Sequence, residues 1–347
     1  MPVPCEPISA DQARRPLFVG VDVGGTSIKI GLVDDNGRTV SHSQIATEEQ
    51  RGAEDAVARI HTKIDAVLQT TGITWDEVAA IGLGTPGSMD IPNGLILEPP
   101  NMPQWRNFPI RDQLASLCQK PVSFANDANA AAFGEYWIGS GRDYDSMVMV
   151  TLGTGVGGGI ILDGVSLDGE HSFGSELGHV MIDQREDARL CVWGGGRGQL
   201  EAYASASAVT ARAQEGLDGG GESSVAARIA AGEELSPLML AEEADKGDAF
   251  SETIILETAR HLSVGVVNVV HTIDPGIVIV GGAMNFGGNS WAIGRKFMSR
   301  LREEFQDLAY GVVRQTPIEY SSLGSQAGYI GAAGIARAAY KRAALAM

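Results

Sequence analysis

A strand–glycine–strand pattern occurs twice in this sequence. Residues 20–37 read GVDVGGTSIKIGLVDDNG, and residues 150–164 read VTLGTGVGGGIILDG. In both stretches, apolar and β-branched residues flank a glycine cluster, and a turn of Asp, Asn or Gly residues ends the stretch. A single stretch of this kind predicts a β-hairpin. Its repetition predicts two related halves, each opening with a hairpin.

Alternating strands and helices follow each hairpin. Helical spacing occurs at 54–72, 110–120 and 128–139, with strands at 78–87 and 121–127 between them, and helical stretches fill most of 200–273. This alternation predicts an α/β fold, and the length of 347 residues favours two domains. Residues 1–16 are predicted to form a loose leader.

Composition excludes several classes of function. The net charge of −17, without clusters of Lys and Arg, argues against nucleic acid as a partner, although a phosphorylated ligand held by a metal ion and backbone N–H groups remains possible. The three widely spaced cysteines (Cys5, Cys118 and Cys191) predict no disulfide framework. We find no signal peptide and no apolar run of membrane-spanning length, so we expect a cytoplasmic protein that binds no membrane.

The glycine clusters allow more than one interpretation. Gly153, Gly155 and Gly158 satisfy the G-x-G-x-x-G dinucleotide fingerprint, but a β-rich stretch follows them where that motif requires a helix. The phosphate-binding motif G-x-x-x-x-G-K-[ST] does not occur. An ordinary hairpin and a phosphate-binding hairpin remain. Thr26 and Thr154 favour the latter, because glycine lets backbone N–H groups approach an anion and the hydroxyl adds a donor.

Several carboxylates occupy positions where a metal-binding or catalytic group is expected. Asp22 precedes the first glycine cluster and is placed to hold Mg²⁺ through water. Asp127 follows a strand and begins a helix, so it is either a general base or part of an N-cap with Asn126. Glu176 and His179 are three residues apart, and they share one side if this segment forms a helical turn.

Six ordered motifs together resemble the ROK family of bacterial sugar kinases, and in particular its ATP-dependent glucokinases. They are DVGGTSIK (22–29), GLGTPG (82–87), NDANAAAFGE (126–135), GTGVGGG (153–159), ELGHVMID (176–183) and IVIVGGA (277–283). The resemblance implies the duplicated actin-like ATPase (ribonuclease H-like) fold, with two α/β domains around a cleft. The smaller domain would comprise 1–130 plus 326–347 and the larger domain 131–325, and a homodimer is expected.

The same resemblance assigns residues to two ligands. For ATP with Mg²⁺ it implies Asp22, Gly24, Gly25, Thr26, Lys29, Gly153, Thr154, Gly155, Gly281 and Gly282, with Asp22 on the metal side. For the hexose it implies Gly87, Asn101, Asn126, Asp127, Glu176, His179 and Glu201, with Asp127 as the catalytic base. Ordinary loop roles remain open for Gly87 and Asn101.

One departure from the family pattern concerns a metal. The family usually carries C-x-C-G-x-x-G-C, whose three thiolates bind a structural zinc together with the His of G-H. Here residues 191–201 read CVWGGGRGQLE, so only Cys191 remains, with Trp193 or Gly194 at the place of the second thiolate and Gln199 at the last. One Cys and one His cannot complete a tetrahedral site, so we predict no structural zinc. Trp193 is a candidate to fill the space.

The expected function is ATP-dependent phosphorylation of a hexose at the 6-hydroxyl, with glucose as the leading substrate. An N-acetylhexosamine (N-acetylglucosamine or N-acetylmannosamine) or fructose kinase of the same family is the alternative, because the motifs are shared. The family also includes sugar-responsive repressors, but the 21 residues before Asp22 are too few for a helix-turn-helix module. A non-catalytic sugar-binding regulator is the remaining class.

Overall fold

The computed structural model describes residues 6–99, 102–192 and 196–346. The chain divides into two compact units, and each is described here by itself. Unit 1 comprises Met1–Asp145, Gly159–Ser175 and Ser322–Met347, and unit 2 comprises Ser146–Gly158 and Glu176–Ser321. The predicted boundary between residues 130 and 131 falls inside a helix, α3, and the predicted domain boundaries stay a prediction.

Unit 1 is built on a five-stranded mixed sheet with the order β3-β2-β1-β4-β7. The first predicted hairpin forms its antiparallel part, and β4 and β7 extend it in parallel. The strands are β1 (Leu17–Val23), β2 (Ser27–Val33), β3 (Thr39–Ala46), β4 (Val78–Thr85) and β7 (Val122–Asn126). A separate two-stranded sheet pairs β5 (Ser88–Asp90) with β6 (Leu95–Glu98).

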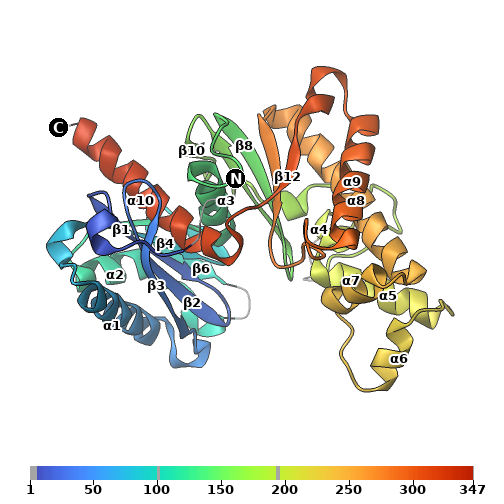
Figure 1. The fold of residues 1–347 in the computed structure, drawn as a ribbon, viewed down its shortest axis with the longest axis horizontal. Coiled ribbons are helices and arrows are strands. Elements are labelled where there is room, and N and C mark those ends of the chain that lie inside the picture. The colour runs from blue at the N-terminus through green and yellow to red at the C-terminus, as the bar shows by residue number, and fades with distance from the viewer. Residues whose placement is uncertain (1–5, 100–101, 193–195, 347) are drawn as a thin grey trace. The chain divides into compact units, whose positions relative to one another are not determined.

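Helices cover both faces of the unit 1 sheet (Figure 1). They are α1 (Ala53–Thr71), α2 (Ile110–Cys118), α3 (Asp127–Trp137) and α10 (Ala327–Leu345). Because strand side chains alternate between faces, Val19 and Val21 enter the core beneath α1, whereas Phe18 faces α10. On that second face, a Cβ on Gly20 would lie 1.8 Å from the carbonyl oxygen of Tyr329. Only glycine lets α10 approach so closely.

The second predicted hairpin begins another five-stranded sheet, with the order β10-β9-β8-β11-β12. Numbered along the chain within each sheet, both orders read 3-2-1-4-5, so the duplication expected from the glycine patterns extends to the whole sheet. The strands are β8 (Ser146–Leu152), β9 (Val156–Leu162), β10 (Val165–Ser166), β11 (Ile277–Gly281) and β12 (Ile318–Tyr320). The β8–β11 and β11–β12 pairs are parallel.

Unit 2 carries most of the helices. They are α4 (Glu201–Ala204), α5 (Ala206–Asp218), α6 (Val225–Ala230), α7 (Pro237–Asp245), α8 (Ala249–Ile273) and α9 (Ala292–Leu308). Among the described residues, α8 is the one helix long and apolar enough to cross a membrane by composition. Its most apolar window is 61% buried, and it packs against α7 and α9. It is therefore a core helix of unit 2.

The N-terminal segment differs from the loose leader predicted from the sequence. The backbone N–H of Ile8 donates to the carbonyl of Thr39 at 2.9 Å, and the Arg15 guanidinium pairs with Glu77 at 2.8 Å. Arg14 donates its backbone N–H to the buried carboxylate of Asp34. The described part of this segment, from residue 6 onward, is thus held by polar contacts to the rest of unit 1, and Ile8, Ala10 and Ala13 also pack against its hydrophobic core.

Candidate functional site

The alternation of side chains between the two faces of the sheet along β1 determines the position of Asp22. It lies on the same face as Phe18 and Gly20, so its carboxylate meets the first turn of α10 beside Gly328. Lys29, its register partner on β2, brings Nζ to 3.8 Å from Asp22 Oδ2 and donates to the carbonyl of Ser325 at 3.1 Å. Burial raises the pKa of Asp22, and the nearby Lys29 charge acts against that rise. A divalent cation would add to this neutralisation.

The glycine turn between β1 and β2, which we call tip 1 (Gly24–Thr26), presents its centre to solvent. Gly25 and Thr26 are exposed. Thr47 anchors the turn from both sides, because its hydroxyl donates to the carbonyl of Gly24 at 2.6 Å and its N–H donates to that of Thr26 at 2.9 Å. The turn is therefore fixed through its carbonyl oxygens, an arrangement that suits an anion-binding loop.

The turn between β8 and β9, which we call tip 2 (Gly153–Gly155), leads to a helix N-terminus. The N–H of Ala206, the first residue of α5, donates to the carbonyl of Gly153 at 2.8 Å, and the Ser207 hydroxyl donates to that of Thr154 at 3.0 Å. The positive end of the α5 dipole thus lies at this turn, where it favours a negatively charged group. Thr154 itself is exposed.

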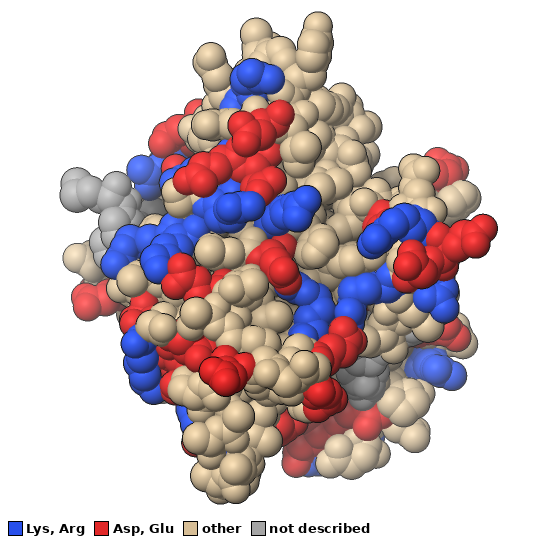
Figure 2. Space-filling view, turned by 90° about the vertical axis from the view of Figure 1, so that its right-hand side faces the viewer, with Lys and Arg blue, Asp and Glu red and all other residues tan. Residues whose placement is uncertain are grey.

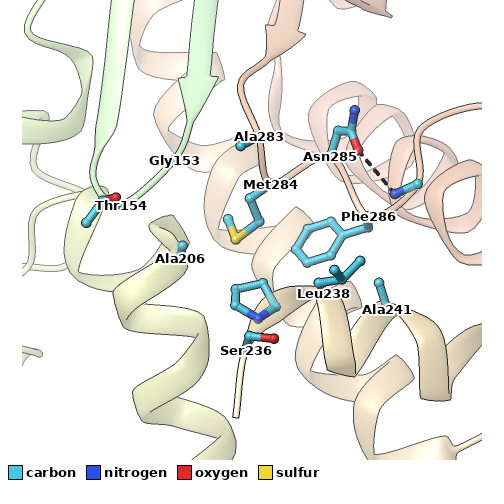
Figure 3. A pocket seen from close by; sticks show the side chains of 12 residues that line it. Gly153, Thr154, Ala206, Ser236, Leu238, Ala241, Ala283, Met284, Asn285 and Phe286 are labelled. Atoms are coloured by element: carbon cyan, nitrogen blue, oxygen red, sulfur yellow. Dashed lines mark hydrogen bonds between the residues drawn. The ribbon is translucent and has the colours of Figure 1, made fainter. Parts of the chain in front are cut away.

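A cavity of about 290 Å³ begins at tip 2 and lies within unit 2. Its wall contains no charged side chain, and Met284 and Phe286 contribute apolar groups to it (Figure 3). The lining residues are Gly153, Thr154, Ala206, Ser236, Pro237, Leu238, Ala241, Ala283, Met284, Asn285, Phe286 and Gly287. A neutral, mostly apolar cavity next to an anion-favouring turn can hold a flat heterocycle joined to phosphates.

The backbone gives Gly282 a structural reason to be glycine. Gly282 adopts a φ of +94°, and a Cβ there would lie 2.2 Å from the carbonyl oxygen of Leu152. Gly281 and Gly282 direct the chain into 283–287, which lines the cavity, but they are not themselves among its lining residues. The predicted contact of both glycines with the nucleotide stays a prediction. Sequence reasoning identified none of Ser236, Leu238, Met284 and Phe286.

Asn126 and Asp127 stand where β7 ends and α3 begins. The Asn126 side chain caps the helix, accepting from the N–H of Ala128 at 2.9 Å and of Asn129 at 3.4 Å. Asp127 is the first helical residue, half-buried, and its Oδ1 also accepts from the N–H of Ala128 at 2.8 Å. The helix cap that the sequence predicted is confirmed at Asn126, and the role of Asp127 as a general base stays a prediction. Asn126 serves as the cap, and the Asp127 carboxylate is held at the carboxyl end of a parallel strand.

Glu176 is the N-cap residue of a short 3-10 turn, Leu177–His179, and His179 is the last residue of that turn. Both side chains are exposed, and His179 Nδ1 lies 3.3 Å from Gln199 Oε1. Partial loss of hydration raises the pKa of Glu176 and is the largest effect. The charge interaction with His179 lowers this pKa, and the charge of Glu201 raises it. The two carboxylates are therefore close enough to sense each other within unit 2.

Glu201, the first residue of α4, is buried, with 8% of its surface exposed. Its Oε2 accepts from the backbone N–H of Val156 at 2.8 Å, and its Oε1 accepts from the thiol of Cys191 at 3.0 Å. A Cβ on Gly155 would lie 2.4 Å from Oε2, so tip 2 needs glycine at this point to admit the carboxylate. Glu201 thus connects the predicted sugar side of unit 2 with tip 2, the turn that is predicted to bind phosphate.

Two residues of the family's zinc pattern, Cys191 and His179, lie among the described residues, and both contact other protein groups. The Cys191 thiol is directed to Glu201, and the His179 ring lies beside Gln199. Within residues 6–99, 102–192 and 196–346, no group of three His, Cys, Asp or Glu side chains could hold an ion. These contacts do not suit the tetrahedral site of the family pattern. The suggestion that Trp193 fills the space lies outside the described residues, as does Gly194.

Hydrogen bonds instead connect the segment 180–200. Leu190 bridges to Arg197 and Met181 to Gln199, and the Arg197 guanidinium donates to the carbonyl of Ala188 at 3.0 Å. The Tyr203 hydroxyl donates to Asp183 at 2.7 Å. These contacts hold the described part of the segment against α4.

Two predicted sugar residues remain less defined. Gly87 follows β4 with a φ of +86°, in the left-handed region that favours glycine, so a backbone reason accounts for it. Its contact with a hexose stays a prediction. Asn101 lies outside the described residues.

Charged side chains on the surface are interspersed. On the face in Figure 2, Lys and Arg side chains lie beside Asp and Glu. Arg228 shows the pattern, because it pairs with Glu233, Glu242 and Glu243. On this face, basic and acidic groups are therefore intermixed.

Comparisons with known proteins identify relatives of this chain. It is 35% identical over 319 residues to a glucokinase of Thermotoga maritima, covering 92% of this chain and 96% of that protein. A crystal structure of a ROK family glucokinase from Streptomyces griseus in complex with glucose and AMPPNP is 31% identical, with a TM-score of 0.73 over 93% of this chain and 99% of that one. A xylose repressor of Caldicellulosiruptor bescii is 28% identical, over 82% of this chain and 69% of the repressor.

The family model for ROK matches residues 18–339. The paired 3-2-1-4-5 sheets agree with the actin-like ATPase fold of the solved relatives. The chain belongs to the ROK family.

Proposed function

We propose that this chain is an ATP-dependent hexose kinase that transfers the γ-phosphoryl group of ATP to the 6-hydroxyl of glucose. The observation that carries the proposal is the neutral cavity of about 290 Å³ that begins at tip 2 and at the N-terminus of α5. Its apolar wall suits adenine, and the adjacent turn suits phosphates. Relatives named glucokinase, one of them crystallised with glucose and AMPPNP, support the sugar and the donor.

In this proposal, phosphoryl transfer depends on positioning and charge neutralisation. The backbone N–H groups of tips 1 and 2 bind the phosphates, and Lys29 balances their charge. Mg²⁺, when held by Asp22 through water, would neutralise the charge that develops on the phosphate oxygens. Gly281 and Gly282 direct the chain that forms the adenine wall.

On the acceptor side, Asp127 accepts the proton of the 6-hydroxyl as that oxygen attacks phosphorus. Glu176, His179 and Glu201 bind the other hydroxyls, because a carboxylate accepts two such bonds in fixed geometry. Because Asn126 Oδ1 accepts hydrogen bonds in the helix cap, the amide NH₂ of Asn126 is the group that donates to the sugar. Gly87 and Asn101 complete the assigned sugar residues. We further propose that the protein is a cytoplasmic homodimer.

The experiment is ADP release with Mg-ATP on glucose, mannose, fructose, N-acetylglucosamine and N-acetylmannosamine. We expect the highest kcat/KM for glucose. Asp127→Asn is expected to lower kcat by about 10²–10⁴ while the hexose still binds. Asp76→Asn, which changes an exposed carboxylate of unit 1, is the matched control and should leave kcat unchanged. An N-acetyl sugar with the highest kcat/KM would replace glucose and leave the kinase assignment intact.

The second candidate is a sugar-binding regulator without kinase activity, which the similarity to a xylose repressor favours. Calorimetric titration with each sugar separates the two. Sugar binding without ADP release above background would support the regulator and refute the kinase.

A further inference from the structure

The Glu201 carboxylate is held by two neutral donors. One is the backbone N–H of Val156 at 2.8 Å, which the strand β9 fixes, and the other is the Cys191 thiol at 3.0 Å. Among the described residues, each oxygen therefore has one protein donor, and it retains lone-pair capacity for a further one. The carboxylate has lost most of its water, so the two donors decide its orientation.

The thiol is itself held in place. Cys191 is 1% exposed and packs with Ala202 and Tyr203 of α4. Its backbone N–H donates to the carbonyl of Gly196 at 3.3 Å, next to the Leu190–Arg197 bridge. The segment therefore delivers Sγ to Glu201 from a fixed backbone, and rotation about one side-chain bond is the freedom that remains.

We propose that Cys191 is a positioning residue for Glu201: its thiol donates a hydrogen bond that fixes the carboxylate in the orientation needed to accept sugar hydroxyls. The sugar part of this inference rests on the proposed function. A hydrogen bond to a charged acceptor is roughly twice as strong as one between neutral groups, which makes even a weak thiol donor effective.

The chain offers a matched control. Cys118, on α2 of unit 1, is also buried, and its thiol lies in the hydrophobic core cluster of that unit. Burial raises the pKa of Cys118 to about 12, so it is a neutral thiol in apolar surroundings. Replacing either cysteine removes the same volume, but only Cys191 has the Glu201 partner.

The first test measures the bond by infrared spectroscopy of the S–H stretch. Cys191→Ser and Cys118→Ser each remove one band and so assign it. We expect the Cys191 band at lower frequency than the Cys118 band, because donation to a carboxylate weakens the S–H bond. Glu201→Gln should shift the Cys191 band upward and leave the Cys118 band in place. A Cys191 band that Glu201→Gln does not move would overturn the inference.

The second test measures the consequence for the sugar. Cys191→Ala is expected to raise the KM for hexose about tenfold, the factor that corresponds to one lost hydrogen bond to a charged group, with the KM for ATP unchanged. Cys191→Ser, which keeps a donor, should restore the KM to within about threefold. Cys118→Ala should lower the melting temperature without changing either KM.

Two results separate the inference from the proposed function. If Cys191→Ala and Cys118→Ala both lower stability and neither changes the hexose KM, Cys191 is merely structural and the inference is wrong. If the unmodified protein phosphorylates no hexose, the proposed function fails, and the infrared comparison still decides whether Cys191 holds Glu201.

Discussion

The carboxylate of Asp22 lies against the backbone of Gly328, where a Cβ atom would stand 2.5 Å from Asp22 Oδ2. Asp22 comes from the first hairpin of the chain, and Gly328 from the first turn of its last helix. A side chain at 328 would displace the carboxylate that we assign to the metal side of the nucleotide.

Gly328→Ala is therefore expected to raise the apparent KM for Mg²⁺ and to lower kcat about tenfold or more, because a one-ångström displacement of a catalytic group carries such a cost. Activity measured as a function of Mg²⁺ concentration checks this. Gly334→Ala, in the same helix, is the matched control: its Cβ would meet the rings of Trp137 and Phe133. Overpacking there should lower stability but not change the Mg²⁺ dependence. Equal Mg²⁺ dependence in the two variants would refute the assignment.

Ala241→Phe places a ring in the unit 2 cavity, because Ala241 is one of its lining residues on α7. The KM for ATP should rise at least about tenfold, the hexose KM should stay unchanged, and binding of an ATP analogue by calorimetry should weaken in parallel. Ala227→Phe, on the exposed side of α6, adds the same ring away from the cavity and should change neither constant. An unchanged ATP KM in Ala241→Phe would mean that the nucleotide binds elsewhere.

Chelation is expected to leave the sugar side intact. After treatment with 1,10-phenanthroline and restoration of Mg²⁺, both the melting temperature and the hexose KM should equal those of the untreated protein. The reason is that Cys191 and His179 are engaged with Glu201 and Gln199 instead of sharing an ion. Elemental analysis provides the direct measurement, and one zinc per chain would contradict the prediction.

Stability should fall as the pH decreases from neutral. Burial lowers the pKa of His261 to about 4, and its ring lies 4.6 Å from that of Tyr203. The unfolded chain binds a proton at His261 near its ordinary pKa of 6.5, whereas the folded protein does so only near 4. Between these values the unfolded state holds more protons, so the stabilising contribution is complete above pH 6.5 and is lost as the pH falls toward 4.

Denaturant unfolding of His261→Phe checks this effect, because phenylalanine keeps a ring but cannot bind a proton. The unmodified protein should lose on the order of 2 kcal/mol more than the variant between pH 7 and pH 5. Identical losses in the two proteins would show that His261 does not carry the pH dependence.

Local patterns carried the prediction of the fold. The two glycine hairpins, the strands predicted at 78–87 and 121–127 and the helix predicted at 128–139 all depend on spacing within a short segment. The structure has each of them, with ends that differ by one or two residues. The N-terminal segment was misjudged, because its contacts with Thr39 and Glu77 join residues far apart in the sequence.

The difference between local patterns and contacts of distant residues also applies to the candidate site. Asp127 and Glu201 were found through motifs, but the cavity wall was not, because it combines tip 2, the start of α5, the start of α7 and the chain after β11. The Cys191–Glu201 bond was missed because the sequence offered Cys191 only as a remnant of a metal pattern. No local signal indicates which acceptor a buried thiol will meet.

The contact of α10 with the first sheet has a consequence for biosynthesis. Unit 1 holds both ends of the chain: Phe18 and Ala80 share one hydrophobic cluster with Tyr329 and Ala333. While the ribosome is still translating unit 2, α10 is not yet present on that face of the sheet, and the apolar side chains that α10 later covers are exposed. The N-terminal strands therefore complete their packing only after α10 has been synthesised. During this interval, the exposed apolar surface that a chaperone can protect is largest.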